Sequence, residues 1–421
     1  MFRQPAFHSQ SVYSILRLLS SFLVVPVIFA NSDTSEVLIY GYCTFITALT
    51  VGLDLGMQSV GIARISKEIR NTLGSFGILL ITLRRMYFIL TIIAVLIFFV
   101  IIIGNSEILN ISYLNKMLLG LHAMFSLINL RGMWQEAVSI GTKKLDVLRK
   151  VQSISLILLL IVFYVLSQYN AAIISFIIAN GIYIITMRLV LFKILYKYIR
   201  EALNDISKLF NFRLFFQDLK FVFPVSVVAL LTGRVIYYIG LTNFDENLSA
   251  LFVAVFTIIS FTGFAAMIYR ESKAFDLTQD IRSISSVFTM SIIWQTAVYI
   301  LSFIVLFFIK DLLVQYRPEL SYMSWKLALV FYFFSYMECI VGLISIILLN
   351  NQKYGYVKWY SLVMLTVVSL LILGSNNKLL SLYNVMSIAL SGQLIYVMIL
   401  SKLLYDYWKN QNQNISTQAK A

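Results

Sequence analysis

The sequence predicts an all-α polytopic membrane protein with about twelve transmembrane helices in two pseudo-symmetric six-helix lobes. Hydrophobic residues make up 60% of the chain and charged residues only 12%, and the mean hydropathy is +0.86. A soluble domain carries about 25% charged residues, so this chain has too few to cover a water-facing surface. About six long apolar runs precede the basic segment 193–220 and about six follow it. Two similar halves in a bilayer are therefore expected.

Each apolar run is long enough to cross the hydrocarbon core as a helix, which needs roughly 17–25 residues. We interpret the first run, 12–30, as a span and not as a cleaved signal peptide, because it is long and Arg17 interrupts it. The other eleven spans are expected at residues 37–63, 86–103, 117–140, 151–167, 171–192, 221–241, 248–269, 287–309, 325–349, 357–373 and 383–405.

The basic segment sets the expected domain organisation. Residues 1–192 form an N-terminal lobe, 193–220 a cytoplasmic basic linker and 221–408 a C-terminal lobe. The polar residues 409–421 are expected to form a disordered cytoplasmic tail, since they offer little apolar surface to bury.

Lysine and arginine positions predict the orientation. With the N-terminus inside, the expected cytoplasmic segments hold 25 of the 33 basic residues, including Arg84, Arg85 and Arg188, and the outer segments hold five. Basic residues near span ends resist translocation, so both termini are expected on the cytoplasmic side of the membrane. The net charge is +14, but the basic residues that produce it fall between apolar runs and not in a separate domain. We therefore expect no nucleic-acid partner.

Motifs for catalysis, metal binding or nucleotide binding are missing from the sequence. It contains no H-E-x-x-H, no G-x-S-x-G and no G-x-x-x-x-G-K-[ST], and Cys43 and Cys339 are far apart inside apolar runs. The longest expected outer segment, around residues 310–324, is too short for an extracytoplasmic catalytic domain. We therefore expect no enzyme activity, no cofactor and no metal site.

Ionisable residues inside the spans are the candidate functional residues, because each costs about 2.5–3.5 kcal/mol at a helix centre. Arg17, Arg131 and Arg234 are candidates for substrate binding, and Asp54 and Glu338 are candidates for ion coupling. Each has an alternative structural reading, as a group that pairs with another side chain and holds helices together. Three arginines against one deep glutamate favour an anionic ligand, since the guanidinium fork suits phosphate and carboxylate.

Two short motifs carry a resemblance to a known family. Tyr40-Gly41-Tyr42 followed by 52–56 (GLDLG) and then Arg64 resembles the second span and loop of bacterial polysaccharide flippases. These proteins are the polysaccharide transporter family of the multidrug/oligosaccharidyl-lipid/polysaccharide exporter superfamily. Pro224 followed by Arg234 is similar to a second stretch of that family, although Gly233 stands where an aspartate is usual.

The resemblance implies a MATE-like fold and an O-antigen-type flippase that works by alternating access. Its substrate would be an undecaprenyl-pyrophosphate-linked oligosaccharide repeat unit, used for O-antigen or capsule-type polysaccharide. Arg17, Arg131 and Arg234 would meet the pyrophosphate or acidic sugars, and Asp54 or Glu338 would couple transport to a proton or sodium gradient. A polymerase and a chain-length regulator of the same pathway are expected partners. The alternatives are an O-antigen polymerase, a multidrug exporter of the same superfamily and a membrane scaffold.

Overall fold

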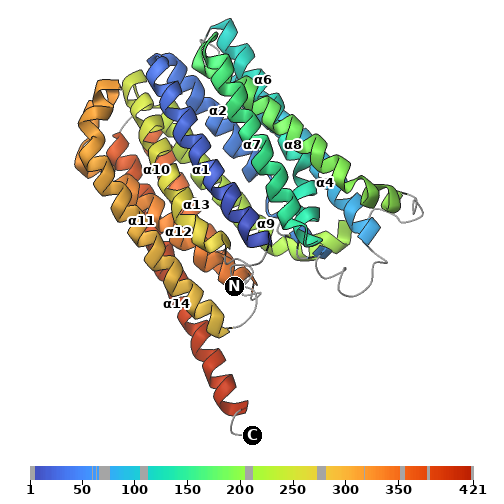
Figure 1. The fold of residues 1–421 in the computed structure, drawn as a ribbon. Helices are drawn as coiled ribbons and strands as arrows, with labels where there is room; N and C mark the ends of the chain where they lie inside the picture. Colours follow the sequence, from blue (N-terminus) through green and yellow to red (C-terminus); the bar gives the residue numbers. More distant parts are fainter. Residues whose placement is uncertain are drawn as a thin grey trace. The chain divides into compact units, whose positions relative to one another are not determined.

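The protein is a set of long α-helices, as Figure 1 shows. The computed structural model describes residues 5–58, 60–62, 64–65, 76–104, 112–203, 212–272, 281–316, 318–350, 356–376 and 380–418. Its helices are α1 (Pro5–Asn31), α2 (Thr34–Gly52), α4 (Phe76–Gly104), α6 (Tyr113–Gly141), α7 (Leu145–Ser167), α8 (Ala172–Leu203), α9 (Phe212–Thr242), α10 (Glu246–Ser272), α11 (Ile281–Tyr316), the 3-10 helix η3 (Pro318–Tyr322), α12 (Trp325–Asn350), α13 (Tyr356–Asn376) and α14 (Leu382–Gln418).

Nine of the described helices are long and apolar enough to cross a membrane. The three α-helices outside that set are α6, α9 and α13, and the last two contain shorter apolar stretches, Ser226–Thr242 and Ser361–Ser375. Because α6 carries the ionisable side chains of Arg131 and Glu136, its polar groups must be covered by neighbouring helices. The all-helical membrane fold predicted from composition is confirmed.

The chain forms two compact units, Met1–Leu230 and Leu231–Ala421. In the first unit α6 packs against α2, α4 and α8, and α7 packs against α1 and α8. One core cluster of this unit surrounds the fully buried side chains of Tyr87, Leu83 and Leu130. In the second unit α12 contacts α10, α11 and α14, and α13 packs on α14.

The expected linker, residues 193–220, is partly helical. α8 continues to Leu203 and α9 begins at Phe212, while residues 204–211 lie outside the described part of the chain. The end of α8 and the start of α9 belong to the first compact unit.

Arg84, Arg85 and Arg188 were assigned to cytoplasmic segments but lie inside long apolar helices. α4 begins at Phe76, so Arg84 and Arg85 lie in its third turn. Lys67 and Arg70 of the same expected loop fall outside the described residues. The apolar run 76–83 is continuous with the one after Arg85, and long arginine stems allow such a helix to form. Arg188 lies in the apolar part of α8 and is buried.

Two further expectations differ from the structure. The expected span 37–63 is interrupted, because α2 ends at Gly52 and a turn at residues 53–56 separates it from the helical residues that follow. The expected disordered tail is a continuation of α14, which runs to Gln418. The tail sequence before that point contains neither glycine nor proline, so nothing in it stops the helix.

Candidate functional site

Arg188 is the centre of a polar network inside the first unit. Its side chain is only 6% exposed and forms an ion pair with Glu136, with 2.7 Å between Nη2 and Oε1. Nη2 and Nε also donate to Asn129 Oδ1 at 2.5 and 3.1 Å, and Nη1 donates to the Gly132 carbonyl at 2.9 Å. A Cβ at position 132 would lie 2.4 Å from Arg188 Cδ, so glycine there lets the arginine lie against α6. The guanidinium therefore joins α8 to α6.

Asp54 has a structural role in the break after α2. The main chain turns there through positive φ angles at Leu55 (51°) and Gly56 (82°). Both Asp54 carboxylate oxygens lie 3.1 Å from the Gln58 backbone N–H, which donates to them, so Asp54 caps the helical turn that follows. The Tyr87 hydroxyl of α4 donates to the same carboxylate. Gln58 in turn donates weakly to Glu136 Oε2 at 3.5 Å, which connects the cap to the network around Arg188.

The two arginines of the first unit that were predicted to bind substrate lie in different surroundings. Arg17 is exposed on α1 and interacts electrostatically with Tyr183 of α8, which also interacts with Arg188 and Glu136. Arg131 is half-buried against α4: its Nη1 donates to the Arg84 carbonyl at 2.8 Å. The structure thus brings Arg17 and Asp54 towards the Arg188 network and places Arg131 against a neighbouring helix.

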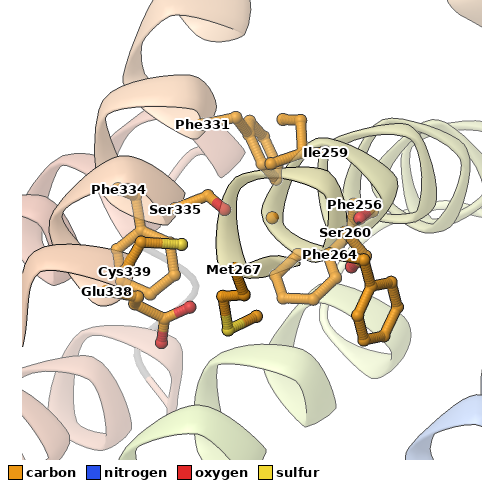
Figure 2. A pocket seen from close by; sticks show the side chains of 11 residues that line it. Phe256, Ile259, Ser260, Phe264, Met267, Phe331, Phe334, Ser335, Glu338 and Cys339 are labelled. Atoms are coloured by element: carbon orange, nitrogen blue, oxygen red, sulfur yellow. Dashed lines mark hydrogen bonds between the residues drawn. The ribbon is translucent and has the colours of Figure 1, made fainter. Parts of the chain in front are cut away.

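The second unit contains a pocket of about 190 Å³ between α10 and α12. Figure 2 shows Glu338, Ser335 and Cys339 of α12 facing Phe264 and Met267 of α10. The lining side chains recur at three- and four-residue spacing, so one face of each helix builds the wall. The remaining lining residues are Phe256, Ile259, Ser260, Gly263, Phe331 and Phe334.

Glu338 is the charged side chain in this lining, and its side chain is exposed. Among the residues that the structure describes, it forms no hydrogen bond and no ion pair within 4 Å. It interacts electrostatically with Arg234 of α9 and with Tyr299 of α11. The structure therefore brings together two of the residues predicted from sequence, Arg234 and Glu338.

The surroundings of Arg234 are unusual for a charged group in a membrane helix. Its Nε is buried and has no hydrogen-bond partner within the described part of the chain. At the neighbouring Gly233 an added Cβ would meet nothing within 4 Å, so α9 borders open space at position 233. This space occurs where the flippase resemblance would place an aspartate.

Two site residues were missed by sequence reasoning. Arg188 was counted with the cytoplasmic linker, although it lies inside the apolar run 171–192 and could have been recognised from that position. Arg270 was assigned to a polar loop, but it is the last residue of the apolar stretch Glu246–Arg270 in α10. Within the described residues, no group of three or more His, Cys, Asp or Glu side chains could hold a metal ion.

Comparisons with known proteins identify the fold. No protein-family model matches the chain, and no curated protein matches its sequence. A mutant of a Vibrio cholerae MATE transporter is 14% identical over 96% of this chain and 95% of that chain, with a TM-score of 0.57. An inward-facing multidrug resistance MATE family transporter of the MOP superfamily is 14% identical over 98% and 96%, with a TM-score of 0.54.

A third solved structure is a MOP superfamily transporter from Pyrococcus furiosus. It is 12% identical, covers 94% of this chain and 92% of that chain, and has a TM-score of 0.51. Its binding pocket is described as having reverse polarity, which suggests a different function for that protein. At these identities the likeness concerns the fold, and it extends over nearly the whole chain. This chain therefore has the same fold as these solved MATE and MOP superfamily structures.

Proposed function

We propose that this protein is a flippase that moves an undecaprenyl-pyrophosphate-linked oligosaccharide across the bacterial inner membrane by alternating access. The repeat unit would serve O-antigen or capsule-type polysaccharide synthesis. The transporter fold supports translocation, and the charges in the membrane helices support an anionic substrate. Both termini are proposed to be cytoplasmic, on the basis of the lysine and arginine distribution.

The observation that carries the proposal is the state of Arg234. A guanidinium in a membrane helix is costly, and a buried N–H without an acceptor adds to that cost. Arg234 has such a group, and the preceding residue, Gly233, borders open space on α9. A phosphate oxygen that reached this Nε would supply the missing acceptor in a charge-assisted hydrogen bond. Of the three predicted substrate arginines, Arg234 is therefore the one whose geometry best supports the role.

Arg17 is proposed as a second contact for the anionic head group, because it is exposed on α1 within an apolar stretch. Arg131 is the weakest of the three candidates for substrate binding. Its guanidinium already donates to the Arg84 carbonyl and lies 4.6 Å from the Phe88 ring centroid. Those contacts support a structural role and leave Arg131 fewer donors for a substrate.

Glu338 is the better of the two candidates for coupling transport to a proton or sodium gradient. The Asp54 carboxylate is occupied by the Gln58 backbone N–H and by the Tyr87 hydroxyl. Glu338 has no such bonds among the described residues, so it can exchange a proton or a cation without breaking a helix cap. A polymerase and a chain-length regulator are proposed to act after the flippase.

The decisive experiment deletes the gene in its host and measures surface polysaccharide together with lipid-linked oligosaccharide at the cytoplasmic face. A flippase predicts lost surface polymer and accumulation of complete repeat units inside. Single unpolymerised units at the surface would instead identify a polymerase. Normal surface polymer would refute the proposal.

A multidrug exporter is the second candidate, and one observation favours it. The charged residue lining the pocket in the second unit is a carboxylate, and its walls include four phenylalanine rings and the Met267 thioether. Aromatic faces with a negative charge suit an organic cation. If cations are exported, cells that lack the gene will retain more ethidium than the parent strain, and Glu338→Gln will fail to restore its efflux.

A further inference from the structure

Arg270 is a second arginine of the C-terminal unit whose hydrogen-bonding capacity is largely unused. Its Nη2 donates to the Met267 thioether at 2.9 Å, and a thioether sulfur is a weak acceptor. Its Nε is buried without a partner among the described residues. A guanidinium offers five donors, so most of those on Arg270 have no acceptor among the described residues.

The position of Arg270 relates it to the pocket between α10 and α12. Met267, which it contacts, and Cys339, with which it interacts electrostatically, both line the pocket. Its Nη1 lies 2.7 Å from the place that a Cβ on Gly342 would take. Gly342 is one turn beyond Glu338 on α12, so the absent side chain lets the guanidinium approach the Glu338 end of the pocket.

Glu338 interacts electrostatically with Arg234 of α9, and Arg270 of α10 lies against Gly342, one turn further along α12. Neither arginine forms an ion pair with Glu338 within 4 Å in the part of the chain described. Two positive charges against one negative charge leave a local excess of one. A mobile carboxylate can balance that excess in part, and an entering oxyanion can replace it.

We propose that Arg234 and Arg270 together form a phosphate-binding site at the Glu338 end of this pocket, and that Glu338 is the counter-charge which the phosphate displaces. The proposal rests on the proposed function and extends it, because it adds Arg270 to the substrate site and gives Glu338 a role in substrate exchange. When the site is empty, Glu338 lowers the cost of two arginines in the membrane. When phosphate binds, the carboxylate is repelled and becomes available to a proton or a cation.

The ligand chemistry follows from the donors. Two guanidinium groups from different helices suit an oxyanion with several acceptor oxygens, which a phosphate or pyrophosphate provides. The phenylalanine side chains of the pocket offer apolar surface to the part of the ligand next to the phosphate. Such a phosphate could come from a lipid-linked sugar or from the head group of an anionic phospholipid, and the test must separate the two.

The test measures binding of radiolabelled inorganic pyrophosphate to the purified full chain in phosphatidylcholine nanodiscs. Arg234→Gln and Arg270→Gln are each expected to weaken binding at least about tenfold. Glu338→Gln is expected to strengthen it, because the internal competitor is removed. Lys402→Gln is the matched control: this lysine is exposed on α14 of the same unit, and its loss should leave binding unchanged. Thermal unfolding of each variant checks that it is folded.

The outcomes separate the alternatives. Native binding by a folded Arg270→Gln variant would overturn the two-arginine site, and weaker binding by Glu338→Gln would overturn the counter-charge role. Loss of pyrophosphate binding in nanodiscs that contain phosphatidylglycerol would assign the site to a phospholipid head group. If the native protein binds pyrophosphate through these arginines but fails to restore surface polysaccharide, the phosphate site is supported and the flippase function is refuted. If an Arg270→Gln variant binds as the native protein does and restores polysaccharide, the flippase function is supported and the two-arginine site is refuted.

Discussion

Replacing Arg188 by glutamine should strongly destabilise the first unit. The change removes the ion pair with Glu136 and leaves that carboxylate, 18% exposed, without its cationic partner. It also leaves Asn129 Oδ1 and the Gly132 carbonyl without the donors that now reach them at 2.5–3.1 Å.

The magnitude follows from what remains unpaired. Removing one partner of a buried ion pair costs about 3–5 kcal/mol, because the other charge stays in a low-dielectric environment. In membranes the unfolded reference state also finds polar partners, which reduces measured hydrogen-bond energies to an average of about 0.6 kcal/mol. We therefore expect Arg188→Gln to lower the free energy of unfolding by roughly 3 kcal/mol, at the low end of the buried-pair range. Glu136→Gln should cost about 1.5–3 kcal/mol, since Arg188 keeps its bonds to Asn129 and Gly132.

Unfolding in mixed micelles by titration with sodium dodecyl sulfate, followed by circular dichroism, measures these differences. Lys193→Gln is the matched control, because Lys193 is exposed and lies on the same helix five residues further on. A surface change of this kind should stay within about 0.5 kcal/mol of the native protein. If Arg188→Gln also stays within that limit, the network does not hold α6 to α8, and the argument from its geometry is wrong.

Three further predictions concern other parts of the chain. Gly240→Ala should lower the melting temperature and reduce the free energy of unfolding by about 1–3 kcal/mol. The new Cβ would lie 2.6 Å from the ring of Phe252, which is fully buried, so an unchanged melting temperature would contradict this packing. Asp54→Ala should cost about 1–2 kcal/mol and speed hydrogen exchange at the Gln58 amide, whose acceptor it removes; unchanged exchange would exclude the cap. Glu338→Gln should give a folded protein that fails to restore surface polysaccharide in the deletion strain, and restored polymer would exclude a coupling role.

The helices could be predicted from sequence because bilayer thickness sets their minimum length and apolar composition marks them. The predicted helix boundaries were wrong where arginines adjoin apolar runs. Arg84 and Arg85 were taken as a loop, although α4 begins eight residues before Arg84 at Phe76. A hydropathy pattern treats each arginine as an interruption, whereas a helix continues through it when the backbone bonds are satisfied and the long stem reaches a polar neighbour.

The break after α2 shows a different limit. The motif 52–56 was recognised as a family resemblance, but its local effect on the chain was not predicted. A glycine at position 56 and an aspartate two residues earlier permit both a positive φ and a helix cap. Periodicity alone cannot reveal this turn, since the apolar pattern continues on both sides of it.

The arginines in the membrane helices differ in how their insertion cost is offset. Each costs about 2.5–3.5 kcal/mol near a helix centre on insertion scales. Arg188 offsets that cost with an ion pair and hydrogen bonds to Asn129 and Gly132, and Arg131 does so in part with the Arg84 carbonyl and the Phe88 ring. Sequence position could not separate these two from Arg234, because the difference lies in which acceptors the neighbouring helices present.

Arg234 and Arg270 are not offset in the same way. Both leave a buried Nε without an acceptor in the described part of the chain. Glu338 interacts electrostatically with Arg234, and Arg270 lies against Gly342 one turn further along α12, but among the described residues Glu338 forms an ion pair with neither arginine within 4 Å. If these two arginines only paired with other side chains to hold helices together, we would expect their guanidinium donors to have acceptors, as those of Arg188 do in the first unit. Two incompletely paired arginines are what a transporter needs if its anionic substrate must bind and then leave. Arginines whose donors were all satisfied by the protein would bind no substrate. Arginines without any counter-charge would be too costly to keep in the membrane.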